Sequence, residues 1–227
     1  MPEPVKRYAA FSCILGSEAI KWAHLKHEGV FRTAPDQAFL PIAGEEFFIT
    51  DPPGFIWKGS LKMSGIPVVV RDRYWKEEGN MLVQAFWTIP LENATGVEIA
   101  KSSLIRYLME AVWIPSAFLE DNIRWTPIDK NTAKATISDG KLSASVTFYF
   151  NEEGAIIKAI SNERFMTVED KYLNYPWIGT MGSYSEMNGF NVPTETDVAW
   201  EIEGEKFTYA KFKVKEIDFS GYSEFSP

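Results

Sequence analysis

Hydrophobic and polar residues alternate along much of this chain, most regularly between residues 132 and 165. A repeat of two residues is the period of a β-strand with one buried face. Asp139-Gly140 and the segment 151–154 separate the alternating runs and are typical of tight turns. The pattern therefore predicts three consecutive antiparallel strands. The apolar face of the middle strand comprises Leu142, Ala144, Val146, Phe148 and Phe150.

The same period predicts strands on both sides of this meander. These further strands are 24–32, 44–50, 55–63, 67–75, 80–89, 177–187, 192–202 and 206–219. In the segment 80–89, Trp87 falls in phase with Val83 and Ala85 and is therefore expected on the apolar face. About eleven strands are more than a flat open sheet carries comfortably, so we expect the sheet to curl into a half-barrel.

Two segments carry a helical pattern instead. Residues 4–15 begin with proline and end before glycine, which predicts a short N-terminal helix. Thr95 and Glu98 form a capping box ahead of a second helix, which Pro115 is expected to stop or kink. We expect this central helix to cover the concave face of the sheet.

These elements predict a mainly β fold: one large curved antiparallel sheet covered by a central helix, with a short N-terminal helix. Neither a repeat of fixed period nor a low-complexity linker divides the chain, so residues 1–227 are expected to form a single domain. Its parts are an N-terminal helical segment (1–22), a first sheet half (23–91), the covering helix (95–120) and a second sheet half (121–227).

Composition narrows the class of partner. The net charge of −8 disfavours binding to nucleic acid or to an anionic membrane surface. Cys13 is the single cysteine, so an intramolecular disulfide is impossible, and the chain as it stands is expected to be cytoplasmic. Aromatic residues make up 15% of the chain, and large rings favour either a wide core or a ligand pocket.

Motifs for metals and cofactors are missing from the sequence. His24 and His27 are the only histidines, and a strand would direct them to opposite faces. We therefore expect two surface histidines near a strand start and no metal site. The sequence has no nucleophile elbow and no glycine-rich phosphate loop, so it predicts no cofactor and no bound nucleotide.

Three charged residues are candidates for a role in a cavity. Asp72 shares its strand phase with valines, and Glu110 lies at the border of the apolar stripe of the central helix, four residues after Arg106. One interpretation is a solvated ion pair on an exposed face. The other is a charged group held in the cavity with a shifted pKa, in which case Glu110 or Asp72 is a candidate general acid or base.

Several phrases resemble an uncharacterised bacterial family of unknown function. They are PEPVKRY (2–8), HEGVFR (27–32), DPPGFIW (51–57), VRDRY (70–74), LIRYLMEAVWIPSAFL (104–119), RWTPID (124–129) and VPTETDVAWE (192–201), and they span nearly the whole chain. The strand order and covering helix of the family are similar to the half-barrel of bacterial lipoprotein carriers, a likeness of shape that does not fix function. The resemblance supplies no catalytic residues. Family members carry membrane-associated sequence ahead of the first of these phrases, which implies a membrane-associated or exported protein if such a segment precedes this chain.

Two main hypotheses of function follow. The first is binding or carriage of a hydrophobic or amphipathic small molecule in the aromatic-lined concave face. The expected ligand contacts are Trp57, Trp87, Trp113 and Phe148 for the apolar part and Arg106, Glu110 or Asp72 for a polar head. The alternative is an enzyme of isomerase, cyclase or hydrolase type that uses Glu110 or Asp72 for proton transfer. A third possibility, an interaction module, would show as an exposed apolar patch on the convex face. The sequence predicts neither the ligand nor the oligomeric state.

Overall fold

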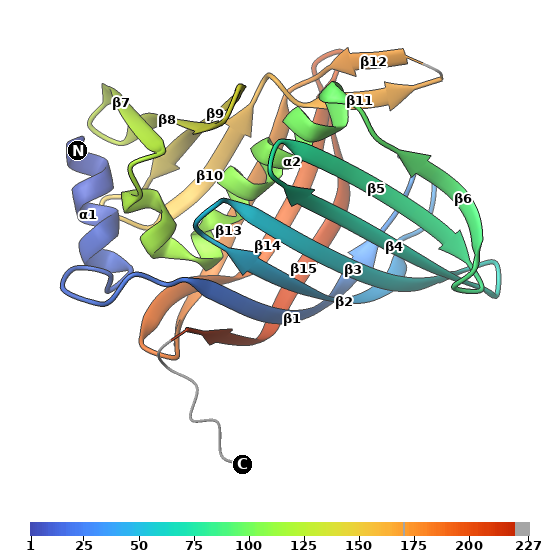
Figure 1. Ribbon diagram of the computed structural model, residues 1–227, viewed down its shortest axis with the longest axis horizontal. Coiled ribbons are helices and arrows are strands. Elements are labelled where there is room, and N and C mark those ends of the chain that lie inside the picture. The colour runs from blue at the N-terminus through green and yellow to red at the C-terminus, as the bar shows by residue number, and fades with distance from the viewer. Residues whose placement is uncertain (170, 221–227) are drawn as a thin grey trace.

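The computed structural model describes residues 1–169 and 171–220. Its main element is a 13-stranded antiparallel sheet in the order β6-β5-β4-β3-β2-β1-β15-β14-β13-β10-β9-β8-β7, and a separate two-stranded sheet pairs β11 with β12 (Figure 1). The strands are β1 Trp22–Phe31, β2 Leu40–Ile49, β3 Gly54–Met63, β4 Ile66–Trp75, β5 Glu78–Ala85, β6 Ile89–Ala94, β7 Ile123–Asp129, β8 Thr132–Asp139, β9 Leu142–Phe150, β10 Ile156–Ser161, β11 Phe165–Val168, β12 Lys171–Asn174, β13 Trp177–Met187, β14 Phe190–Ile202 and β15 Glu205–Phe219.

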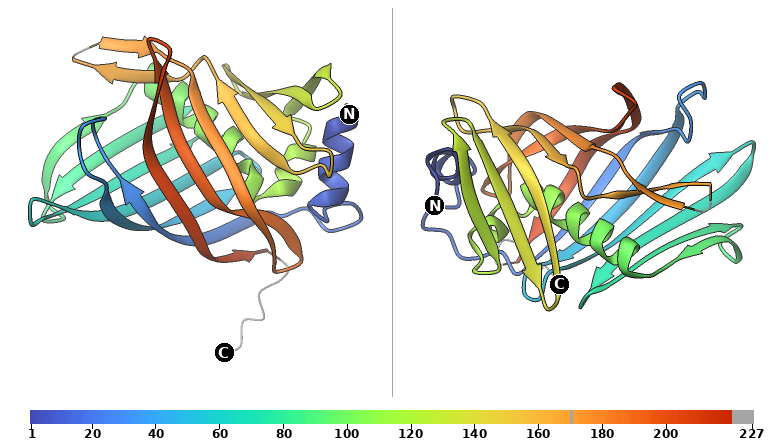
Figure 2. Two further views of the ribbon diagram at one scale, coloured as in Figure 1. Left: turned by 180° about the vertical axis from the view of Figure 1, so that it is seen from behind. Right: turned by 90° about the horizontal axis from the view of Figure 1, so that it is seen from above.

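One helix runs along the concave side of this curved sheet. It is α2 (Val97–Glu110), and the view from above shows it in the trough between the two sheet halves (Figure 2). Two short 3-10 turns continue it, η1 (Ala111–Trp113) and η2 (Pro115–Leu119). The N-terminal helix α1 (Glu3–Phe11) packs at the end of the sheet that holds β7 and β8. The expected fold class, a mainly β half-barrel with a covering helix and a short N-terminal helix, is confirmed.

Several predicted details are wrong. The main sheet has 13 strands instead of about eleven, because alternation did not reveal β6, whose residues are almost all exposed, or β7, whose second half is exposed. The covering element is a helix followed by two 3-10 turns. The capping box fails because Gly96, with φ of 113°, is the cap residue and the cap makes no side-chain hydrogen bond. Strand β5 ends at Ala85, so Trp87 lies in a turn and not on the apolar face.

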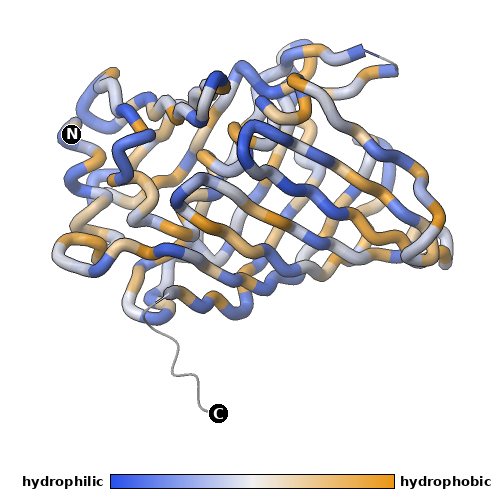
Figure 3. The backbone as a smooth tube through the Cα atoms, viewed as in Figure 1, coloured by the Kyte–Doolittle hydropathy of each residue, from blue (hydrophilic) through white to orange (hydrophobic). Residues whose placement is uncertain are grey.

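The central meander follows its predicted pattern. Along β9, Ala144, Val146, Phe148 and Phe150 are buried, and the serines and threonines between them are more exposed. Figure 3 shows hydrophobic and hydrophilic positions alternating along the strands. The Phe148 ring packs edge-on against Phe118 of η2 at 5.2 Å, and it contacts Trp125 of β7 at 5.5 Å. This half of the concave face is therefore a filled aromatic core.

Glycine in β5 lets α2 approach the sheet closely. A Cβ added at Gly79 would lie 2.7 Å from the Cα of Ala100 and 2.7 Å from the carbonyl oxygen of Ile99. Both obstacles are helix backbone, which cannot swing aside as a long side chain can. The close approach fixes the height of α2 above β4 and β5, and it thereby fixes the position of Arg106 less than two turns further along the helix.

A substitution at this position tests the packing. We expect Gly79→Ala to lower the free energy of unfolding by about 1–3 kcal/mol, because the new methyl group pushes the helix off the sheet. Gly182→Ala is the matched control, since a Cβ there meets nothing within 4 Å. Its effect should stay within about 0.5 kcal/mol. Urea denaturation of both variants measures the difference, and equal effects would contradict the assigned contact.

Candidate functional site

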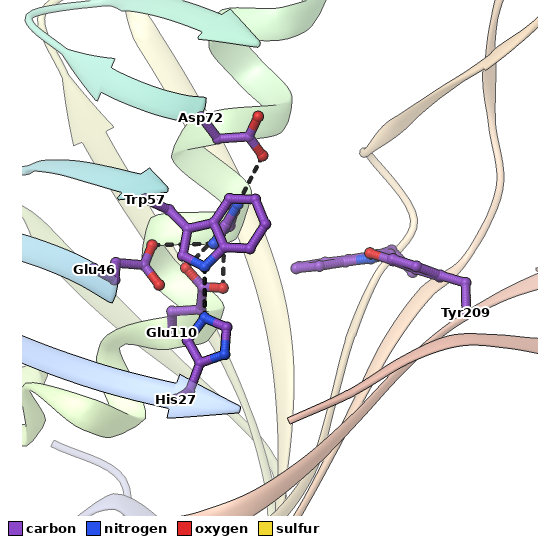
Figure 4. A network of polar contacts seen from close by, with 8 residues as sticks. His27, Glu46, Trp57, Asp72, Glu110 and Tyr209 are labelled. Atoms are coloured by element: carbon purple, nitrogen blue, oxygen red, sulfur yellow. Dashed lines mark hydrogen bonds and ion pairs between the residues drawn. The ribbon is translucent and has the colours of Figure 1, made fainter. Parts of the chain in front are cut away.

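A buried arginine lies at the centre of the concave face, with three carboxylates around it (Figure 4). Arg106 of α2 donates from Nη1 to Asp72 of β4 at 2.7 Å and from Nη2 to Glu46 of β2 at 3.1 Å. Its Nε donates to both carboxylate oxygens of Glu110, one helical turn later, at 2.9 Å. The arginine side chain is only 11% exposed and the Glu46 side chain 2%. The cluster therefore joins the helix to two strands of the sheet.

Two aromatic rings flank the guanidinium. Its Cζ lies 5.0 Å from the ring centroid of Phe55 and 4.9 Å from that of Trp57, both on β3. Aromatic faces attract a cation more strongly when water is excluded. Arg106 is thus stabilised by charge on one side and by rings on another.

Burial and neighbouring charge act on the cluster in opposite senses. Burial alone would lower the pKa of Arg106, but Glu110, Glu46 and Asp72 together raise it above its ordinary value. Burial also raises the pKa of Glu46 well above its usual range, although Arg106 acts the other way and Glu110 adds to the rise. Burial is therefore the main cause of the raised pKa of Glu46, and the guanidinium of Arg106 offsets it only in part.

His27 extends the network along β1. The Nε1 of Trp57 donates to the Nε2 of His27 at 2.7 Å, so this nitrogen is the acceptor. Burial, with a smaller effect from Arg106, lowers the pKa of His27 to about 4, and the ring is neutral near pH 7. The expectation of two surface histidines is wrong for His27, which is 7% exposed, because it occupies the interior phase of β1.

The opposite wall of the half-barrel carries a second arginine. Arg164, in the connection between β10 and β11, stacks on the ring of Trp177 with its Cζ 3.8 Å from the centroid. The Nε1 of Trp177 in turn donates to the hydroxyl of Tyr209 at 3.0 Å. Burial lowers the pKa of Arg164, and the charge of Arg106 is one of the smaller causes that act with it. Figure 4 shows Trp57 and Tyr209 on facing walls.

Unpaired polar atoms gather in this interior. Among the described residues, buried atoms without a hydrogen-bond partner include Nε and Nη1 of Arg164, Oδ1 of Asp72, Nδ1 of His27 and Oγ1 of Thr196. Buried polar atoms are nearly always paired, so a group of orphans calls for an explanation. Arg164 is the only one of these four residues that is a cation without a hydrogen-bonded counterion.

The structure brings together some of the residues singled out by sequence and separates others. Trp57, Arg106, Asp72 and Glu110 form one cluster. Trp113 donates from Nε1 to the carbonyl of Pro193 and belongs, with Phe148, to the packed core.

Trp87 lies apart from the cluster. It is 63% exposed and contributes to a hollow of about 1110 Å³ on the convex face, over β14, β15, β1, β2, β3 and β4. The strand register shows which face of the sheet the hollow occupies. Glu28, a lining residue, follows His27, whose side chain points to the interior, so Glu28 points to the opposite face. Its partner across the sheet, Lys213, also lines the hollow. This hollow therefore lies on the opposite face of the sheet from the charged cluster.

Sequence reasoning missed two residues of the site. In β2, Glu45 and Glu46 are followed by Phe47 and Phe48, so each strand phase holds one acid and one ring and alternation could not select the buried one. Arg164 stands in an irregular connection, where no period applies. The connection is held against α2, because the backbone N–H of Phe165 donates to the hydroxyl of Ser102. Only this contact would have indicated a buried position for Arg164, and the sequence pattern does not reveal it.

Residues 1–169 and 171–220, which the structure describes, hold no group of three or more potential metal ligands. Within them, α2 and the other helices are each too short or too polar to cross a bilayer.

The fold and the site define a β half-barrel of one antiparallel sheet, with a helix over its concave face and buried charges beneath the helix. Residues 1–212 match the family of unknown function DUF6544, and the chain belongs to this family. The predicted membership of an uncharacterised family with a half-barrel fold is confirmed. Among curated proteins, none matches the chain.

Two solved structures resemble the chain at low sequence identity. A DUF1329 family protein from Desulfovibrio piger has a TM-score of 0.50 at 11% identity, over 97% of this chain and 95% of the other. A protein described as an outer membrane lipoprotein-sorting domain, from Vibrio parahaemolyticus, has a TM-score of 0.45 at 10% identity, over 98% and 93%. The likeness to the first of these structures shows the fold alone, and an open half-barrel is a shape consistent with hydrophobic ligand binding in general.

The energetic role of the cluster can be measured. We expect Arg106→Met to lower the free energy of unfolding by about 3–5 kcal/mol, because it leaves buried carboxylates without their cation. Arg73→Met is the control: Arg73 is 42% exposed and pairs at 4.0 Å with Glu78, so its loss should cost under about 1 kcal/mol. Urea denaturation gives both values.

A second variant separates charge from packing. Adding Asp72→Asn and Glu110→Gln to Arg106→Met should recover most of the lost stability, because two of the three carboxylates are then replaced by neutral amides. If the triple variant were as unstable as the single one, the loss would come from packing and the electrostatic account would fail.

Proposed function

We propose that this protein binds an amphipathic molecule inside the half-barrel, with an oxygen-rich head group on Arg164 and an apolar chain along the inner wall toward the open end. The observation that carries the proposal is the Arg164 guanidinium, which lies over the ring of Trp177 and has two buried nitrogens without a partner. Carboxylate and ester oxygens both accept hydrogen bonds in the geometry that such a guanidinium offers.

Arg164 suits this role better than Arg106 does. All three donor groups of Arg106 are engaged by Glu46, Asp72 and Glu110. A head group could reach Arg106 only by displacing a carboxylate. Arg164 has a ring beneath it and free donors on its edge, so a head group would satisfy polar atoms that are otherwise buried without a partner. Trp57, which lies beside the guanidinium of Arg106, faces the same interior. Of the aromatic residues that the sequence suggested as ligand contacts, it is the one that we retain.

The apolar chain of the ligand has a matching wall. Beyond the cluster, toward the loops that follow β1 and β3, the inner phase of the strands continues with apolar residues that are only partly buried. They are Phe31, Leu40, Met63, Val70 and Val83. Burying such partly exposed surface against an acyl chain is favourable by about 25 cal/mol per Å². A polar group at depth and an apolar wall near the opening form the polarity gradient that an amphipathic ligand needs.

An enzyme that uses the same interior is the second candidate. It draws on two observations: Glu46 is a buried acid whose pKa is raised, and Asp72 has an Oδ1 without a partner. A buried carboxyl group with a raised pKa is a candidate proton donor, and a carboxylate oxygen without a partner is free to contact a substrate. Binding remains the stronger proposal, because Glu46 itself is covered by Arg106 and Glu110 and does not open to a substrate.

A fluorescent fatty acid tests the binding proposal. We expect cis-parinaric acid to bind the protein with enhanced emission, and Arg164→Gln to weaken its binding about tenfold or more, the loss expected for a charge-assisted hydrogen bond of about 1.5–3 kcal/mol. Arg124→Gln, the same change at an exposed position of β7, is the control and should leave binding unchanged.

Competition then distinguishes the two head groups. Displacement by dodecanoate but not by its methyl ester would assign a carboxylate, and the reverse would assign an ester. If neither displaces the probe, or if Arg164→Gln binds as the natural chain does, the proposed site is wrong.

A further inference from the structure

The turn between β5 and β6 exposes two large aromatic side chains at the end of the molecule far from α1 (Figure 1). Phe86 is 50% exposed and Trp87 is 63% exposed. Three more apolar residues lie beside them in sequence or across the sheet and are also exposed: Ile66, Ile89 and Leu91. Contiguous exposed apolar groups of this kind mark interaction sites.

The backbone of this turn is unfavourable for the residues it contains. Phe86 has φ of 50° and Trp87 has φ of 63°, and the N–H of Thr88 closes the turn on the carbonyl of Ala85 at 3.2 Å. Such a turn favours Asn-Gly, because both central residues take the left-handed conformation that bulky side chains resist. The chain gives up stability to display two rings at its tip, which is a sign of function at that position.

The same region is free of charge. Segments 63–70 and 79–91, which include the strand ends on either side of the tip, contain no Asp, Glu, Lys or Arg, although charged residues make up 24% of the chain. Figure 3 shows hydrophobic positions along this end of the sheet. Charged side chains are costly inside the hydrocarbon of a bilayer, and Trp and Phe are favoured at its boundary.

We propose that this tip, defined as Ile66, Phe86, Trp87, Ile89 and Leu91, docks on the surface of a zwitterionic lipid bilayer and inserts its rings at the boundary between headgroups and acyl chains. The net charge of −8 disfavours both an anionic bilayer and a second copy of the chain. Strand addition at the edge strand β6 is also disfavoured, because Pro90 has no N–H to donate.

Docking in this orientation would bring the open end of the half-barrel to the membrane. The strands of the main sheet are antiparallel, so the turn at 86–88 lies at the same end as the turn at 64–65, the loop 32–39 and the turn at 203–204. The docking inference rests on the tip alone, and it holds whether or not an amphipathic ligand binds inside.

Vesicle flotation tests the inference. The full chain should float with phosphatidylcholine vesicles. The fraction of the double variant Phe86→Asn, Trp87→Gly that floats should be lower by a factor of about ten or more, since this variant loses both rings. The same variant should melt about 2–4 °C higher than the natural chain, because Asn-Gly relieves the turn. A loss of binding with a gain in Tm cannot be attributed to misfolding.

The control is the double variant Leu15→Ser, Ile128→Ser, which removes two equally exposed apolar residues at the opposite end. It should float like the natural chain. The inference is overturned if the natural chain does not float, or if both double variants lose binding alike. It is also overturned if size-exclusion chromatography shows the natural chain as a dimer that the Asn-Gly variant abolishes, because a second copy would then be the partner.

Discussion

The buried guanidinium of Arg106 is the constraint around which the structure is arranged. Its three carboxylates come from α2, β2 and β4, so the charges pair only when the helix lies at one height and one rotation above the sheet. The close approach at Gly79 permits that height. Removing a buried partner is costly, whereas a surface pair contributes little. The cluster therefore selects one placement of the helix among the many that an apolar trough would tolerate.

This placement divides the concave face into two parts with different roles. On the side of β7–β10, aromatic rings such as Phe118, Phe148 and Trp125 fill the space beneath the 3-10 turns. On the other side, two clusters that contain Trp57 and Tyr209 face one another, and the polar atoms between them are incompletely paired. One part of the concave face is therefore a packed core, and the other holds polar groups that are available to bind a ligand. The exposed rings of the β5–β6 turn lie at the end of the molecule that holds this second part.

The sequence predicted the large features because they rest on periodicity. A strand with one buried face has a period of two, and β9 satisfies it at every position from Ala144 to Phe150. Trp57 was identified because it falls in the apolar phase of its strand, and Asp72 because it shares its strand phase with valines. Glu110 was identified at the border of the apolar stripe of the helix, four residues after Arg106. Trp87 was misplaced because two residues in the left-handed conformation ended β5 early, and alternation cannot report a turn of that type. Glu46 and Arg164 escaped notice because the partners that make them unusual are distant in sequence.

The central claim is that an amphipathic ligand lies inside the half-barrel with its head group on Arg164, and not in the hollow on the convex face. A crystal structure of the protein with an ω-brominated dodecanoate tests this most directly, because bromine can be located by its anomalous signal. The account predicts carboxylate density at Nε and Nη1 of Arg164 and a bromine peak beside the inner wall near Met63. A bromine peak confined to the convex hollow beside Val69 and Trp87 would contradict it.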